Sequence, residues 1–137
     1  MKKVIFLSIG ITFLASGIAN AAGFDLSVSA ASNCFDISSK SITDTAQHTI
    51  PKGRYVVSLK STATYCGSNC PVPKVTIYIT TNNSQQGWFN QIEANRPSVI
   101  DVSGIGLDAN TVYAFYTDIL CSDNLGGGVL SFKTVNP

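Results

Sequence analysis

The sequence predicts an all-β fold, a single-domain β-sandwich or jelly roll held by two disulfide bonds. Apolar and polar residues alternate with a period of two in its clearest segments, which is the pattern of strands with one buried face. β-branched and aromatic residues are enriched in these segments, and no window shows a sustained helical stripe. About seven to nine short strands with turns between them are typical of a sandwich.

Five segments carry the alternating pattern most strongly. They are residues 24–29, 55–60, 75–80, 112–117 and 129–135, and weaker strands are expected near 34–37, 48–50, 87–92 and 98–103. Turn-forming residues separate the segments at Pro51-Lys52-Gly53, Pro71-Val72-Pro73, Asn82-Asn83-Ser84, Asn95-Arg96-Pro97, Gly104-Ile105-Gly106 and Gly126-Gly127-Gly128. The most polar stretch, residues 38–49, is expected to form an excursion on the surface.

The first 21 residues have the organisation of a secretory signal peptide. Lys2 and Lys3 form a short positive region, an apolar run covers residues 4–15, and Ala19-Asn20-Ala21 is an A-x-A cleavage site. The apolar run is too short for a membrane span, and no other segment is long and apolar enough to cross a bilayer. We therefore expect residues 22–137 to form one soluble domain, secreted or periplasmic, with no membrane insertion.

Charge is low and scattered in the expected mature chain. Without Lys2 and Lys3, seven basic residues face eight acidic residues, and the basic residues do not cluster along the sequence. Nucleic acid and anionic lipid require a concentrated basic patch, so neither is expected as a partner. A single domain of this size also has little room for a deep catalytic cleft, and we do not expect an enzyme.

Four cysteines in an exported chain predict two disulfide bonds, and three connectivities are possible. We favour Cys66–Cys70, because Gly67 and Asn69 between them tolerate a sharp bend. The remaining pair, Cys34–Cys121, would tie the N-terminal region to the loop that follows residue 118. A zinc site at Cys66 and Cys70 is the rival interpretation, although zinc fingers usually pair two such motifs.

Residues 118–128 form a glycine-rich turn that carries several hard oxygen ligands. Asp118, Ser122, Asp123 and Asn124 stand within seven residues of one another, between two strongly predicted strands. Carboxylate, hydroxyl, amide and main-chain oxygens on a tight loop are the ligands that Ca²⁺ prefers. The alternative is a plain hairpin loop, in which Asp and Asn bond to their own backbone and glycines supply positive φ angles.

Trp88, Tyr65 and His48 are the other candidates for binding or chemistry. Trp88 is the single tryptophan and would stack on a sugar if exposed, although one ring of the Trp88-Phe89 pair is expected in the core. Tyr65, beside Cys66, belongs either to the core or to the border of a site. His48, the single histidine, has no nucleophile-elbow motif to work with, and a solvated loop position is expected for it.

The order of these pieces resembles the calcium-dependent galactophilic lectins of bacteria, which are small jelly-roll proteins. The likeness extends from Gly53 to Val135. Residues 53–59 with the later Thr64-Tyr65 look like the family's strand that ends in a tyrosine, and Cys66 and Cys70 look like its short-range cysteine pair. Tyr116-Thr117-Asp118, then Ser122, Asn124 and the strand 130–135, look like its calcium loop.

In that family calcium bridges the protein and the sugar hydroxyls. The resemblance implies that Asp118 is a bidentate or bridging calcium ligand and that Tyr65 and Ser122 are neutral oxygen ligands. It also implies that Asn124, with Asp123, binds calcium and sugar together. The sequence departs from the family pattern in three places: Leu125 stands where a second asparagine is usual, Cys121 lies inside the loop, and no histidine follows His48.

The sequence therefore predicts a non-enzymatic, carbohydrate-binding domain that depends on calcium and recognises a glycan or glycoconjugate. A shallow sugar site gains useful affinity through multivalency, so a homo-oligomer is expected. The alternative is a protein-interaction or structural β-sandwich without a metal site, such as a toxin-associated subunit, an inhibitor or a surface-assembly component.

Overall fold

The computed structural model describes residues 23–66, 69–81, 87–102 and 109–135. The expected signal peptide (1–21) and the expected turns at 82–84 and 104–106 lie outside these ranges. Within them the chain is almost entirely β-structure, with one short 3₁₀ helix, η2, at Cys121–Asp123. No helix in the described part is long and apolar enough to cross a membrane.

The first sheet contains four antiparallel strands in the order β1-β12-β5-β10. Their bounds are Phe24–Ser29 for β1, Gly127–Thr134 for β12, Arg54–Ser61 for β5 and Ser98–Asp101 for β10. β12 lies in the middle and pairs with both β1 and β5, which brings the two ends of the described chain into one sheet. Alternate residues of β5 are buried and partly exposed, as the period-two pattern predicts.

The second sheet is built around β11 (Ala109–Asp118). β8 (Lys74–Thr81) pairs with one edge of β11, and β9 (Gly87–Glu93) forms the outer strand beyond β8. The other edge of β11 pairs first with β4 (Ala46–Pro51), antiparallel, and then with β2 (Cys34–Asp36), parallel. A two-residue strand, β3 (Ser41–Ile42), extends this sheet beyond β2.

The core lies between the inward faces of the two sheets. The largest buried side chains come from both sheets and include Tyr55, Phe132 and Leu130 on one side and Ile77, Ile79, Ile92 and Tyr116 on the other. The two buried tyrosines keep hydrogen bonds for their hydroxyls: Tyr55 donates to the Pro51 carbonyl at 2.9 Å, and Tyr116 lies 3.2 Å from the Ser61 hydroxyl. Burial raises the pKa of both hydroxyls.

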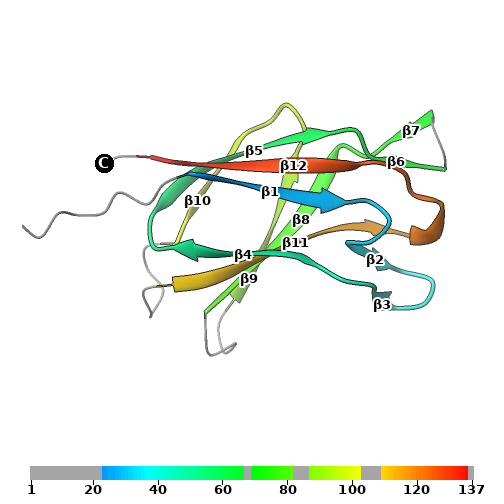
Figure 1. Cartoon of the computed structure of the whole chain (residues 1–137), viewed down its shortest axis with the longest axis horizontal. Coiled ribbons are helices and arrows are strands. Elements are labelled where there is room, and N and C mark those ends of the chain that lie inside the picture. Colours follow the sequence, from blue (N-terminus) through cyan, green and yellow to red (C-terminus); the bar gives the residue numbers. More distant parts are fainter. Residues whose placement is uncertain (1–22, 67–68, 82–86, 103–108, 136–137) are drawn as a thin grey trace, which may run out of the picture.

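One end of the sandwich gathers most of the loops. Figure 1 shows the β11–β12 connection at this end together with β2, β3 and the small hairpin of β6 (Thr64–Tyr65) and β7 (Cys70–Pro71), opposite to the C-terminus. Each disulfide bond lies here as well: Cys34–Cys121 joins β2 to η2, and Cys66–Cys70 closes the β6–β7 hairpin. We call this the loop end of the sandwich.

The all-β class and both disulfide bonds are confirmed, and the two packed sheets fit the predicted sandwich. Zinc at Cys66 and Cys70 was the wrong alternative, because these two cysteines form a disulfide bond and have no thiolate left to bind a metal. The expected surface excursion at 38–49 is also wrong in part. β3 and the first half of β4 lie there, because their backbones hydrogen-bond to β2 and β11 although most of their side chains are polar and exposed.

The two disulfide bonds should differ in their contribution to stability. In the chain-entropy model, a cross-link over a separation of 87 residues contributes about 4.6 kcal/mol, and one over a separation of 4 residues contributes about 2 kcal/mol. Removing both cysteines of the first pair should therefore lower the free energy of unfolding about twice as much as removing the second pair. Urea unfolding of the two double alanine variants measures this difference, and equal losses would contradict it.

Candidate functional site

The loop between β11 and β12 is fixed to β2 by covalent and polar contacts. The Cys34–Cys121 disulfide bond joins β2 to η2, and both cysteines are buried. Asp36, at the end of β2, accepts a hydrogen bond from the Cys121 N–H on Oδ2 at 3.1 Å. The backbone at the start of the loop is therefore held at two points.

Asp36 is a structural carboxylate in a local turn. Its Oδ1 accepts the Ser38 hydroxyl at 2.7 Å and the Ser39 N–H at 2.9 Å, while Oδ2 accepts the Cys121 N–H. Donors on both oxygens stabilise the charged form, so the hydrogen bonds from Ser38, then Ser39 and Cys121, hold the pKa of this carboxyl far below its ordinary value. These contacts occupy the carboxylate, which leaves it little capacity for an external ligand.

Asp118 ends β11 beside Asp36, its register partner in the parallel pair. Its Oδ1 accepts the N–H of Ile119 at 2.6 Å, which leaves Oδ2 for a further partner. The Tyr65 hydroxyl lies nearby and donates to the Thr117 carbonyl at 2.7 Å. Burial raises the pKa of the Tyr65 hydroxyl, and the negative charge of Asp118 raises it further.

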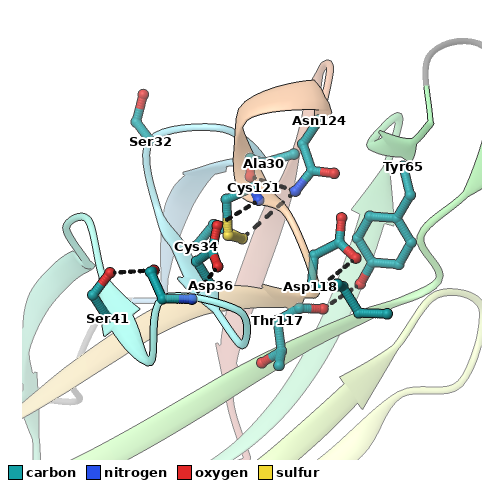
Figure 2. The surroundings of a disulfide bond; sticks show 12 residues. Ala30, Ser32, Cys34, Asp36, Ser41, Tyr65, Thr117, Asp118, Cys121 and Asn124 are labelled. Carbon is teal, nitrogen blue, oxygen red and sulfur yellow. Dashed lines mark hydrogen bonds between the residues drawn. A yellow bond between two sulfur atoms is a disulfide. The ribbon is translucent and has the colours of Figure 1, made fainter.

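Asn124 lies inside the loop end with only 3% of its surface exposed. Its Nδ2 donates to the Ala30 carbonyl at 3.2 Å and to the Cys34 sulfur at 3.5 Å. Its Oδ1 is buried and has no hydrogen-bond partner. Figure 2 shows Nδ2 turned to the disulfide and Oδ1 turned to the opposite side, where Asp118 and Tyr65 lie.

Main-chain pairing holds Asn124 next to Tyr65. The backbones of Thr64 and Leu125 form an antiparallel bridge with two hydrogen bonds of 3.0 Å. This bridge places the residues that flank it, Tyr65 and Asn124, across from one another. Tyr65, Asp118 and Asn124 thus come together from β6, β11 and the loop, and we call these three residues the loop site.

A buried, unpartnered amide oxygen has a free-energy cost that requires an explanation. An unpaired polar group typically costs about 1–3 kcal/mol on burial. Among the described residues Asn110 also has unpartnered side-chain atoms, but its strand neighbours are Ile50 and Thr81, and neither is a carboxylate. Of these two amides, Asn124 is the one whose oxygen faces the side on which a carboxylate, Asp118, lies.

The other residues predicted for the site lie apart from this cluster. Ser122 and Asp123 are on η2 with exposed side chains, close in sequence but on the outside of the loop. Trp88 packs against the core from β9, paired through Ile79 with Val112. Val112 is six residues from Asp118, about 20 Å along an extended strand, so Trp88 belongs to a different part of the surface.

His48 is also distant from the loop carboxylates. It pairs with Val112 across β4 and β11, six residues before Asp118, and its exposed ring stacks on Phe24 with centroids 4.1 Å apart. The single histidine is therefore not placed to exchange a proton with Asp118 or Asp123.

The donor set at the loop site favours a hard cation over a transition metal. No group of three or more histidine, cysteine, aspartate or glutamate side chains occurs within the described ranges that would hold a metal. Both cysteines nearest to Asn124 are oxidised, which removes thiolate ligands. The remaining donors are one carboxylate and one amide oxygen, which are the hard oxygen ligands that Ca²⁺ prefers, so most of a calcium shell would have to come from water or ligand oxygens.

Sequence reasoning missed Asp36 as the residue that anchors the loop. The signal was present in Asp36-Ile37-Ser38-Ser39, where a carboxylate precedes hydroxyl and N–H donors at the spacing of an Asx turn. The contact with Cys121 spans 85 residues, and no local pattern indicates it.

Comparison of the chain with protein-family models, with curated proteins and with solved structures finds no match. The likeness to galactophilic lectins therefore remains an expectation from the sequence.

Stability at low pH should depend on Asp36. Because the folded pKa lies below the unfolded value of 3.8, the carboxylate stabilises the fold above that value, and this contribution disappears as the pH falls below it. Asp36→Asn should flatten the loss of stability between about pH 4 and pH 2. Thermal unfolding across this range measures the effect. The control is Asp25→Asn, which changes an exposed aspartate of β1. An identical pH profile for wild type and Asp36→Asn would contradict it.

Proposed function

We propose that this chain is a non-enzymatic carbohydrate-binding protein that uses calcium at the loop site. The single observation that supports the proposal best is the buried Asn124 Oδ1, which has no partner and faces the side on which Asp118 lies. A bound cation would supply the partner that this oxygen lacks. Two disulfide bonds fit an oxidising compartment, and we place the protein outside the cytoplasm, secreted or periplasmic.

The role of each residue of the loop site would follow from how deeply it is buried. Asn124 is buried, so its oxygen would hold the ion from beneath without reaching a sugar. The Asp118 carboxylate would neutralise the ion from the side through the oxygen that Ile119 leaves free. Calcium would supply open coordination positions for vicinal sugar hydroxyls. The exposed Ser122 and Asp123 would take part only if a glycan extended from the ion to the outside of the loop.

Preorganisation supports this function. The Cys34–Cys121 bond and the Asp36–Cys121 hydrogen bond hold the loop before any ligand arrives, which reduces the ordering cost of binding. One carboxylate gives a weak site, on the order of 10⁻⁴–10⁻³ M for calcium, as in extracellular modules. Sugar affinity at such a site would also be modest, so binding through several copies of the chain is expected.

A protein-interaction role is the second candidate. Four apolar side chains on or beside the same loop are exposed, at 49% for Ile37, 69% for Ile119, 48% for Leu120 and 57% for Leu125. Exposed apolar groups that gather at one end of a domain favour docking to a protein. This role, as a toxin-associated subunit, an inhibitor or a surface-assembly component, requires no metal, so calcium dependence separates the two candidates.

Calcium should stabilise the fold. With a dissociation constant of about 10⁻⁴–10⁻³ M, 10 mM calcium adds about 1.4–2.7 kcal/mol to the free energy of unfolding. Asp118→Asn should abolish this gain. Asp44→Asn is the matched control, because Asp44 caps the next N–H in the same way, at 2.7 Å, but belongs to the β3–β4 connection and not to the loop site. A midpoint of thermal unfolding that ignores calcium, or that responds equally in both variants, would contradict the metal site.

Glycan binding at the loop site should require both calcium and Asp118. A glycan array probed with the disulfide-intact protein in about 5–10 mM calcium, which is roughly 5 to 100 times the expected dissociation constant, should show a class of sugar that is bound only with calcium, and EDTA should remove that signal. Asp118→Asn should lose it and Asp44→Asn should keep it. An array in which EDTA weakens no signal would separate sugar recognition from the loop site. No binding in either condition would favour the protein-interaction role.

A further inference from the structure

The outer face of the second sheet carries a cluster of aromatic side chains away from the loop site. Tyr78 on β8, Phe89 on β9 and Tyr113 on β11 occupy outward positions of three adjacent strands. Phe89 is 67% exposed, one of the most exposed large apolar residues in the described part of the chain. Because burial of apolar surface is favourable, a ligand that covers the exposed Phe89 ring would gain binding free energy.

These three rings form an ordered row across the strands. Tyr78 is the register partner of both Phe89 and Tyr113. The Tyr78 and Phe89 rings stack with centroids 4.5 Å apart and planes inclined by 25°, and the Tyr78 and Tyr113 rings stack at 6.2 Å and 26°. Gly87 leaves the space that the Tyr78 ring occupies, since a Cβ at that position would overlap the ring. The row is thus fixed in position by the sheet.

A groove runs beside this row. Its volume is about 430 Å³, and its lining consists of four aromatic rings, one isoleucine and two threonines: Tyr78, Phe89, Tyr113, Phe115, Ile42, Thr45 and Thr80. We call it the aromatic groove. A volume of this size lies within the range of small-ligand pockets. Apolar ring surfaces beside a few hydroxyl groups match a sugar, which has apolar C–H faces and polar edges.

The absence of charge in the lining narrows the choice of ligand. None of the residues that line the aromatic groove is acidic or basic. Neighbouring outward positions on β9 and β4 are Gln91 and Gln47, which are neutral hydrogen-bonding groups. Nucleic acids, anionic lipids and phosphorylated peptides all require positive charge. A neutral glycan requires none, and it uses the rings, hydroxyls and amides that are present.

We propose that the aromatic groove is a second carbohydrate site, which binds the neutral sugar units of a glycan without calcium. The groove shares no residue with the loop site: Phe115, the lining residue of β11 that is nearest to Asp118, stands three residues before it, about 10 Å along an extended strand. Binding here stands or falls separately from the calcium-dependent function. Two sites on one domain would allow a single polysaccharide chain, or two chains, to be held at once.

Affinity electrophoresis in EDTA tests the proposal on the disulfide-intact protein. The probes are four neutral polysaccharides, xylan, mannan, mixed-linkage β-glucan and starch, each cast into a native gel. At least one should retard the wild type, and Phe89→Ala should weaken this binding about tenfold. Val99→Ala is the matched control, because Val99 is also exposed, at 62%, but lies on β10 of the other sheet, and it should bind as the wild type does.

Three results would overturn the proposal. The first is the absence of retardation by all four polysaccharides. The second is retardation that Phe89→Ala leaves unchanged. The third is a dimer in sedimentation velocity that Phe89→Ala dissociates, because the face would then be covered by a second copy of the chain. EDTA is present throughout, so the result does not depend on calcium at the loop site. A negative result therefore rejects only the aromatic groove, and a positive result does not require the loop site.

Discussion

The Cys34–Cys121 disulfide bond is the constraint on which the loop end depends. It joins β2, a strand of three residues, to the single described helical turn, η2, across 87 residues of sequence. So short a strand pairs weakly by itself, and the covalent bond keeps it in parallel register with the end of β11. The same bond sets the position of Asn124, whose amide donates to the Cys34 sulfur. The disulfide bond that holds β2 in place therefore also holds the side chain of Asn124.

Polar groups at the loop end fall into two kinds. Asp36 is fully engaged by three donors and serves only to hold the loop. Asn124 and Asp118 each have one engaged atom and one that remains open to a further partner. A buried amide oxygen is usually satisfied by a protein donor or by ordered water. A rigid support with an oxygen that no protein group satisfies would suit the preorganised site that we propose.

Local pattern was sufficient for much of the fold. Alternation identified all five strong strands, and turn chemistry with export predicted both disulfide bonds. A weak strand was expected near 34–37, but its parallel pairing with β11 could not be predicted, because this pairing joins segments that are distant in the sequence. Within residues 38–51, β3 was missed and β4 was predicted only at 48–50, since backbone pairing rather than hydrophobic burial holds both strands to β2 and β11.

For the aromatic candidates, the prediction depended on which alternate positions of β9 face the core. Ile92 is buried between the polar Gln91 and Glu93, so even-numbered positions of β9 face the core. Trp88 therefore points inward and Phe89 outward, and the exposed ring is the neighbour of the residue chosen from the sequence. For the loop, the residue types were readable, but the burial of Asn124 and its separation from Ser122 and Asp123 follow from long-range contacts.

The most direct test of the central claim is an NMR titration of calcium chloride into the ¹⁵N-labelled, disulfide-intact protein. The Asn124 side-chain amide and the Ile119 backbone amide, which is bonded to Asp118 Oδ1, should shift together and saturate at millimolar calcium. The Thr45 amide, capped in the same way by Asp44, should not follow them. Shifts that do not saturate, or that appear equally at Thr45, would show that calcium meets only surface carboxylates and would contradict a site built around Asn124.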